Sequence, residues 1–327
     1  MEWGGNAVKS PRITAKLQPM RIFRSFNSAM QAAGAHHGAV TVGNFDGVHL
    51  GHSQVLAEVK GHALALSGPA VAVTFEPHPR ATLFPGEAPR RLCHLHERLE
   101  LLGKAGMDEV LLLHFNHSLA SWPPQKFVRH LYAALKFRHM HVGYDFAFGR
   151  DRAGHIDSLR DLGEEMAFTV SEASAFEMQA AVVSSSRIRS AIEAADFSLA
   201  EALLGRPYTI SGHVGKGEQR GRKLGFPTAN LDMKDLAHPP PGIYAVRAAS
   251  GDQCWNGAAY LGFRPTFAGR TLILETHMLD GNPDLYKKRL TVTFVQRVRE
   301  DRAFRNGEEL SAQIARDCEA ARNILGA

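Results

Sequence analysis

Short apolar runs alternate with amphipathic segments over the first two thirds of the chain. The runs have the length of buried strands, and the segments between them carry apolar residues near helical spacing. Strands are expected at 39–42, 70–75, 108–115 and 139–142, and helices at 53–66, 94–104, 124–135, 185–194 and 198–204. This alternation predicts an α/β fold with a parallel sheet and crossover helices, in which ligands collect beyond the carboxyl ends of the strands.

The pattern changes after Arg206 and Pro207. Strands are then expected without helices between them, separated by turns rich in Gly and Pro, at 208–214, 242–249, 256–261, 271–279 and 289–298. Regular strands of this kind predict an antiparallel barrel or sandwich. A last amphipathic helix is expected over 307–325. We therefore expect a disordered extension over 1–19, an α/β domain over 20–204 and a β domain over 205–327.

Composition narrows the class of protein. The chain has 327 residues, 44% of them hydrophobic, which suffices for two domain cores. It contains no apolar stretch near the roughly 20 residues that cross a bilayer and no signal-peptide pattern, so we expect a cytoplasmic protein without membrane contact. Three scattered cysteines fit a reducing compartment. The net charge is +5, but the basic residues are dispersed, so no nucleic-acid partner is expected.

The first candidate site is the sequence GNFDGVHLGH at 43–52, between an expected strand and an expected helix. Amides at a helix N-terminus are unsatisfied and favour an anion, and Gly47 and Gly51 would let phosphate oxygens approach the backbone. His49 and His52, three residues apart, would direct ring nitrogens at the same anion. A surface turn with solvated histidines is the alternative. The other candidate phosphate contacts here are Gly43, Asn44, Phe45 and Asp46.

A second helix start, SSSRIR at 184–189, brings serine hydroxyls and arginines together. Ser185, Ser186 and Arg189 could hold a polyphosphate there, although a serine cap followed by solvated arginines would give the same pattern. Further polar residues, among them Asp145, follow the expected strands. They lie in the sequences TFEPHP at 74–79 and GYDFAFG at 143–149.

The β domain opens with a basic, glycine-rich segment that ends in GRKLGFPTAN at 221–230. It fits neither the dinucleotide nor the P-loop pattern. A loop of this kind offers amides to phosphate. Thr228 and Asn230, on a strand expected after the loop, offer neutral oxygens to Mg²⁺, which prefers hard oxygen ligands. A hairpin loop with surface lysines is the alternative. The candidate phosphate contacts of the segment are Lys216, Gly217, Gly221, Arg222, Gly225 and Pro227.

Glu275 stands inside an otherwise apolar strand, LETHML at 274–279. A carboxylate in such a position is costly unless it is exposed or serves a function. It is therefore a candidate general base, or else an outward-facing surface residue.

These motifs together resemble bacterial bifunctional riboflavin kinases/FAD synthetases. GNFDGVHLGH and SSSRIR are similar to the HxGH and SSTxIR signatures of the nucleotidyltransferase domain, and GRKLGFPTAN to the riboflavin kinase signature. The resemblance implies a Rossmann-like adenylyltransferase domain followed by a β-barrel kinase domain. It also implies phosphorylation of riboflavin to FMN, then adenylyl transfer from ATP to FMN, giving FAD and pyrophosphate.

The resemblance assigns roles residue by residue. It implies that Glu275 is the general base of the kinase, and that Thr228 and Asn230 bind the metal. It implies that His49 and His52 act in adenylyl transfer. Candidate flavin or nucleotide contacts are Asp145, Phe226, Arg264 and Arg299. Tyr260 departs from the family pattern, which has asparagine there, so any polar contact of that asparagine is in question.

The expected ligands are riboflavin, FMN, FAD and ATP with Mg²⁺, and the expected state is a monomer or weak homo-oligomer. Two alternatives stay open: a family member with a single activity, and a flavin-binding sensor without catalysis. Histidine pairs at 36/37, 94/96 and 139/141 are not expected to bind metal, because no third ligand of suitable spacing accompanies them.

Overall fold

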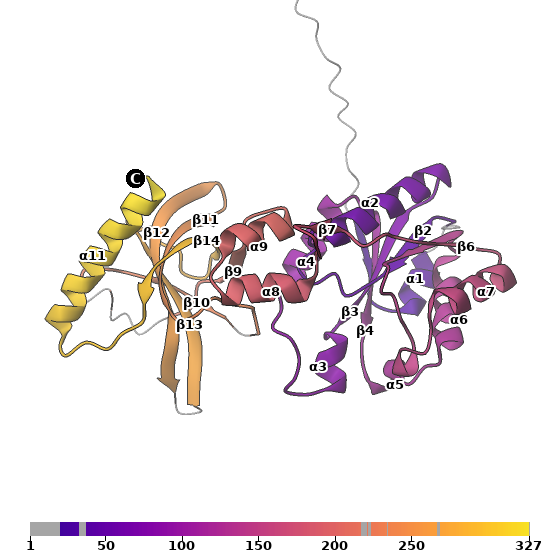
Figure 1. Cartoon of the computed structure of the whole chain (residues 1–327), viewed down its shortest axis with the longest axis horizontal. Helices are drawn as coiled ribbons and strands as arrows, with labels where there is room; N and C mark the ends of the chain where they lie inside the picture. Colours follow the sequence, from indigo (N-terminus) through magenta and orange to yellow (C-terminus); the bar gives the residue numbers. More distant parts are fainter. Residues whose placement is uncertain are drawn as a thin grey trace, which may run out of the picture.

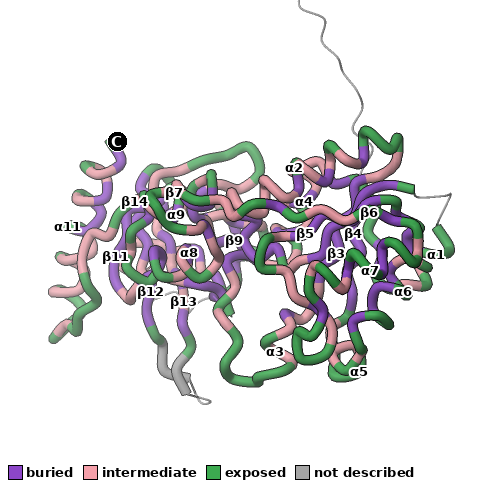
Figure 2. Tube along the Cα trace, turned by 45° about the vertical axis from the view of Figure 1, so that its right-hand side comes forward, coloured by how far each residue is buried: buried purple, intermediate pink, exposed green. Residues whose placement is uncertain are grey.

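The computed structural model describes residues 20–32, 37–216, 221, 224–233, 235–266 and 269–326. The extension over 1–19, expected to be disordered, lies outside these ranges. Two sheets lie beside each other along the long axis of the molecule, one flanked by helices and the other coiled into a barrel (Figure 1). Buried residues follow the strands of both sheets, whereas the outer faces of the helices are exposed (Figure 2).

The first sheet is parallel, which confirms the α/β prediction. Its order is β1-β4-β3-β2-β5-β6, and the strands are β1 (Arg21–Phe23), β2 (Ala39–Val42), β3 (Ala70–Glu76), β4 (Glu109–His114), β5 (His139–Val142) and β6 (Thr169–Glu172). The helices of this part are α1 (Phe26–Ala32), α2 (Leu50–Ala65), α3 (Pro79–Leu83), α4 (Leu95–Lys104), α5 (His117–Ala120), α6 (Pro124–Leu135) and α7 (Ile156–Met166), with a 3₁₀ turn at Arg150–Arg152.

Both faces of the parallel sheet are buried, which explains why the sequences of the central strands are continuously apolar. Along β2, Val40 and Val42 pack in a cluster with residues of α6 and α7, whereas Ala39 packs in another with residues of α2 and α4. Side chains alternate between the faces of a strand, so neighbouring residues enter different clusters. The elements β1, α7 and β6 were not expected from the sequence. β6 lies at the sheet edge and has no fully buried position, so it lacks an apolar signal.

The second sheet is antiparallel, in the order β10-β13-β12-β11-β14-β9. Its strands are β9 (Thr209–His213), β10 (Ala229–Asp232), β11 (Gly242–Ser250), β12 (Gln253–Thr266), β13 (Gly269–Met278) and β14 (Arg289–Glu300). A bridge between Gly215 and Asn230, with the Gly215 N–H donating to the Asn230 carbonyl at 2.9 Å, brings the two edges together. The sheet is thus a nearly closed barrel, which decides between the two architectures left open by the sequence.

The last helix, α11 (Gly307–Leu325), covers the outside of the barrel (Figure 1). Ala245 of β11 packs with Cys318 and Ala321 of this helix, whereas the preceding residue, Tyr244, belongs to the large cluster inside the barrel. None of the helices in the described ranges combines the length and apolar character needed to cross a bilayer.

Two helices, α8 (Ser185–Glu193) and α9 (Phe197–Leu204), lie between the parallel sheet and the barrel (Figure 1). Their apolar faces belong to the same buried cluster as the barrel interior. Within it, the ring of Phe197 stacks on that of Phe294 with centroids 5.4 Å apart. A hairpin of β7 (Glu177–Met178) and β8 (Ala181–Val182) precedes them. The expected domain boundary at 204/205 falls between α9 and β9 and stays a prediction.

Candidate active sites

The two histidines of the first motif occupy the start of α2, directly after β2. His49 is the N-cap, and its Nδ1 accepts a hydrogen bond from the His52 N–H at 3.3 Å. The imidazole rings stack with centroids 3.7 Å apart. The cap uses one ring nitrogen of His49 and leaves Nε2 for a ligand, beside the amides of the first helical turn.

Burial keeps both rings neutral at pH 7. Burial, together with smaller effects of the guanidinium groups of Arg206 and Arg189, lowers the pKa of His49 to about 4. Burial, with a smaller effect of His49, lowers the pKa of His52 well below its ordinary value. The fixed positive charge near a bound phosphate would therefore come from the arginines, and the imidazoles would act as neutral hydrogen-bonding groups.

The glycines of this turn have a packing role that the sequence did not reveal. A Cβ on Gly47, whose φ is +78°, would lie 2.8 Å from Cδ1 of Leu92. A Cβ on Gly51 would lie 3.3 Å from the ring of His49. Glycine at these two positions therefore allows the chain to turn and the His49 ring to pack against the helix. This packing role is separate from the predicted approach of a ligand to the backbone.

Asp46 connects the motif to α8. Its buried carboxylate accepts the Leu92 N–H at 3.0 Å and a guanidinium N–H of Arg189 at 2.5 Å. The Ser185 hydroxyl donates to the backbone carbonyl of Asp46 at 3.1 Å, and Ser184 is the N-cap of α8. Ser186 occupies the second position of that helix. The fold thus brings the two predicted phosphate motifs to one place, and Arg189 is partnered there rather than solvated.

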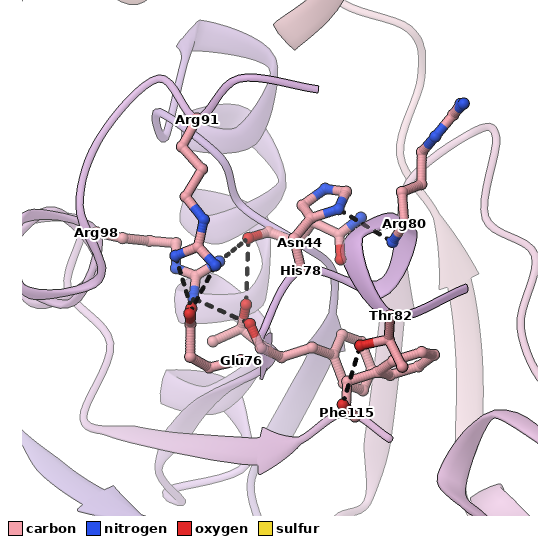
Figure 3. A network of polar contacts seen from close by, with 10 residues as sticks. Asn44, Glu76, His78, Arg80, Thr82, Arg91, Arg98 and Phe115 are labelled. Carbon is pink, nitrogen blue, oxygen red and sulfur yellow. Dashed lines mark hydrogen bonds and ion pairs between the residues drawn. The ribbon is translucent and has the colours of Figure 1, made fainter. Parts of the chain in front are cut away.

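Beside this site, Glu76 at the end of β3 holds two arginines together (Figure 3). Arg91 donates to both of its carboxylate oxygens, at 2.6 and 3.1 Å, and Arg98 donates to one at 2.9 Å. Arg98 also donates to the Asn44 carbonyl at 3.0 Å, and burial lowers its pKa. This network fixes the chain just before the histidine motif.

Arg98 and Arg206 are residues that the sequence reasoning missed. Arg98 occupies a core-facing position of α4, one turn after Leu95 and one turn before Leu102. A cation among apolar core-facing positions is unusual, so the sequence alone could have indicated that Arg98 has a buried partner. Arg206, the second residue after α9, donates to the Gly47 carbonyl at 2.7 Å and so holds the motif turn. No local pattern marks that contact.

Of the other predicted residues, Gly43 follows β2 and Asp145 lies exposed after the neighbouring strand β5.

The second candidate site is built on adjacent strands of the barrel. Glu275 of β13 is paired in register with Asn230 of β10 on one side and Tyr260 of β12 on the other. The Thr228 hydroxyl donates to Oε2 of Glu275 at 3.4 Å, and the Asn230 side-chain amide donates to the Thr228 carbonyl at 3.3 Å. Three residues predicted from two separate motifs therefore meet.

Two cavities flank this group. A cavity of about 500 Å³ is lined by Lys216, Pro227, Thr228 and Asn230 together with the turn at 281–286. A second cavity of about 360 Å³ lies between the barrel and α11, and Phe226, Thr228, Glu275 and Arg299 are among its lining residues. Thr228 lines both cavities, so the hydroxyl beside Glu275 lies where the two meet.

The wall of the smaller cavity contains two polar links, one to the segment before α11 and one to α11 itself. The Tyr260 hydroxyl donates to Asp301 at 3.1 Å. Arg299 donates to both carboxylate oxygens of Asp317 in α11, at 2.8 and 2.7 Å. The tyrosine that replaces the family asparagine thus has a polar partner of its own in this chain.

The structure describes only some of the remaining predicted residues of this domain. Gly221 lines the smaller cavity, and Gly225 has a φ of +88°, which favours glycine. Arg264 belongs to β12, but its side chain is outside the description. Gly217 and Arg222 lie outside the described residues.

The chain thus combines a parallel α/β fold, with two histidines at the start of a helix, and a barrel with a carboxylate beside two cavities. This combination defines a phosphotransfer protein with two sites. Comparison with known proteins agrees with this class. The FAD synthetase family model matches residues 32–187 and the riboflavin kinase family model matches residues 204–325. The chain belongs to the family of bifunctional riboflavin kinases/FMN adenylyltransferases.

Relatives of that name cover nearly the whole chain. The protein from Pseudomonas fluorescens is 45% identical over 88% of this chain and 94% of its own, and that from Escherichia coli K12 is 36% identical over 94% and 98%. A crystal structure from Streptococcus pneumoniae, described as a macrolide-efflux protein, superimposes with a TM-score of 0.78 at 29% identity, covering 89% of this chain and 95% of that one.

Proposed function

We propose that this chain phosphorylates riboflavin to FMN in the barrel and adenylylates FMN to FAD in the α/β domain. Family membership supports both activities. The observation that carries the proposal is that each domain assembles a complete polar site from motifs distant in sequence. In one site, Asp46, three residues before His49, contacts Ser185 and Arg189, and in the other Thr228 contacts Glu275.

In the α/β domain, an oxygen of the FMN phosphate would attack the α-phosphorus of ATP. A P–O bond forms there, the bond to the β-phosphate breaks, and its electron pair leaves with pyrophosphate. The second pKa of a phosphate monoester is about 6, so the attacking group is already dianionic at pH 7 and needs no general base. The site has to align the groups and neutralise charge, which suits His49, His52 and the start of α2.

Arg189 and the serines at the start of α8 would hold the leaving pyrophosphate. Arg189 pairs with Asp46 in the structure, so it is pre-positioned next to the motif. A polyphosphate would compete with that carboxylate for the guanidinium group. The buried carboxylate thus orients Arg189 before the nucleotide binds.

In the barrel, Glu275 would accept the proton of the terminal ribityl hydroxyl of riboflavin as that oxygen attacks the γ-phosphorus of ATP. The bond between the γ-phosphorus and the β-phosphate oxygen then breaks, and ADP leaves. We assign ATP to the larger, Lys216-lined cavity and the flavin to the smaller one beside Phe226, Tyr260 and Arg299. The Thr228–Glu275 contact lies where the reacting atoms would have to meet.

Kinases and adenylyltransferases work on ATP with a divalent metal, and we propose Mg²⁺. The oxygens of Thr228, Asn230 and Glu275 are hard donors, and the Asn230 amide nitrogen is turned to the Thr228 carbonyl, which leaves its oxygen for a cation. A magnesium ion bound there would neutralise charge on the transferred phosphate.

The alternatives from the sequence make different predictions. A flavin sensor would need neither a general base nor metal ligands. A protein with a single activity would need only one of the two sites. The intact contacts around Asp46 and around Glu275 disfavour both. A cytoplasmic location, a monomeric or weakly associated state and the absence of nucleic-acid binding stay predictions.

The test is a time course with the purified chain, riboflavin, ATP and Mg²⁺, followed by chromatography. FMN appearing first and FAD afterwards is the expected result. FMN alone would restrict catalysis to the barrel. Flavin binding without conversion would favour the sensor and overturn the proposal.

A further inference from the structure

A cluster of histidines lies on α2, away from its catalytic end. His62 comes from the helix, and His139 and His141 come from β5, which lies under it. A ligand atom of each of the three rings lies within 4.8 Å of the others. Strand residues two apart share a face, so β5 directs both of its histidines at the helix. The sequence reasoning rejected the 139/141 pair for want of a third ligand, and the fold supplies it.

A fourth donor completes the group. Glu58 lies one turn before His62 on the same face of α2, and its Oε2 is 2.7 Å from Nε2 of His141. The His141 side chain is only 3% exposed, and its Nε2 is hydrogen-bonded to the Glu58 carboxylate. The contact places a carboxylate oxygen beside the three imidazoles, and a divalent cation bound among these groups would replace the proton on Nε2.

Hydroxyl groups on the neighbouring edge strand hold the outer nitrogens of these rings. Thr169 Oγ1 lies 2.7 Å from Nδ1 of His139, and Ser171 Oγ lies 2.7 Å from Nδ1 of His141. Metal-binding histidines usually have their second nitrogen fixed in this way, which sets the ring orientation. Ser171 Oγ also lies 2.7 Å from Nε2 of His139, and that contact would be exchanged for a metal bond.

We propose that Glu58, His62, His139 and His141 form a Zn²⁺ site. Three imidazoles and one carboxylate suit a tetrahedral zinc ion and are poor ligands for Mg²⁺, so this site is separate from the ATP-linked metal. Glu58 is 39% exposed and gives the ion a path from solvent. The proposal does not depend on the proposed catalytic function.

The position in the fold assigns the ion a structural role. His62 is ten residues beyond His52 on α2, which is about 15 Å along a helix axis. The site thus fastens the far end of the catalytic helix to β5 and, through Thr169 and Ser171, to β6. Among the residues that the structure describes, it contacts none that is assigned to phosphate.

The test is zinc binding by the full chain without a histidine tag. Metal-free protein is incubated with ZnCl₂, passed over a desalting column and analysed by mass spectrometry for metal. We expect one zinc per chain, and for His62→Ala an affinity at least about 10-fold weaker. Glu58→Gln should weaken binding in the same direction. Both positions face solvent in part, and circular dichroism checks that the variants fold.

His117→Ala is the matched control, because His117 is an exposed histidine outside the cluster. It should retain one zinc, and Co²⁺ added to the metal-free wild type should show the visible absorption of a tetrahedral site. Riboflavin phosphorylation, located in the other domain, should be unchanged in every variant. Absence of bound zinc in the wild type, or equal retention by His62→Ala, would overturn the proposal.

Discussion

Arg189 and Asp46 form an ion pair at 2.5 Å although 143 residues separate them in the sequence. Both side chains are nearly buried, so the pair holds the start of α8 against the histidine turn with little competition from water. The first site therefore depends on the packing of α8, and the arginine is held in place before any nucleotide arrives.

We expect Arg189→Ala to slow FMN adenylylation by about 10²- to 10³-fold, the usual cost of removing one charge-stabilising donor from a phosphate site. The rate is measured with FMN supplied directly. Arg160→Ala, which removes an exposed arginine of α7, is the control and should leave the rate unchanged. Riboflavin phosphorylation should persist in both variants, and its loss in Arg189→Ala would point to misfolding instead.

The double variant His49→Ala/His52→Ala should abolish FAD formation and still convert riboflavin to FMN. The substitutions remove the ligand-facing imidazoles and the N-cap of α2, so a loss of at least about 100-fold is expected. Chromatography of the reaction with riboflavin and ATP would show FMN accumulating. If FMN formation stopped as well, the assignment of the two reactions to two sites would be wrong.

Glu275→Gln should have the opposite effect. The amide keeps the size of the side chain but cannot accept the ribityl proton, so riboflavin phosphorylation should fall by about 10²- to 10⁴-fold. FAD formation from added FMN should continue at the wild-type rate. Measuring both reactions on one preparation makes each the control for the other, and an unchanged kinase rate would exclude Glu275 as the base.

Stability should fall as the pH drops below about 6.5. The pKa of His49 is about 4 in the folded chain, so its ring binds a proton more readily when the chain is unfolded. Between pH 7 and pH 5 this difference lowers the free energy of unfolding by about 2 kcal/mol. Denaturant titrations at both pH values measure it. In His49→Asn, which keeps a capping side chain, the pH dependence should shrink, and an equally steep dependence would contradict the assignment.

The sequence predicted the elements with strong periodicity and the motifs that follow them. The parallel sheet, the barrel, the two middle helices and α11 were expected because buried strands and amphipathic helices leave clear patterns. β6 was missed since it lies at an edge and alternates little, whereas a strand was expected directly after the glycine-rich loop, where β10 lies. Short or exposed strands are defined by their neighbours rather than by their own residues.

Contacts between distant segments were beyond the reach of the sequence. His62 stands in a helix with no unusual neighbour, and only the register of α2 over β5 places it beside His139 and His141. The same is true of Arg206, whose contact with the Gly47 carbonyl depends on how the chain leaves α9. Such pairings need the tertiary structure, because local spacing carries no signal for them.

The cluster that α8 and α9 share with the barrel limits how modular this protein can be. Ile188, Ile192 and Phe197 are buried against barrel residues, yet α8 also carries Arg189 of the proposed adenylyltransferase site. A gene split at residue 187 would remove that arginine, and a split at 204 would leave an apolar helical face open to water. Separating the halves would therefore either expose part of this shared core or remove Arg189, so α8 and α9 couple the packing of the barrel to the geometry of the histidine turn.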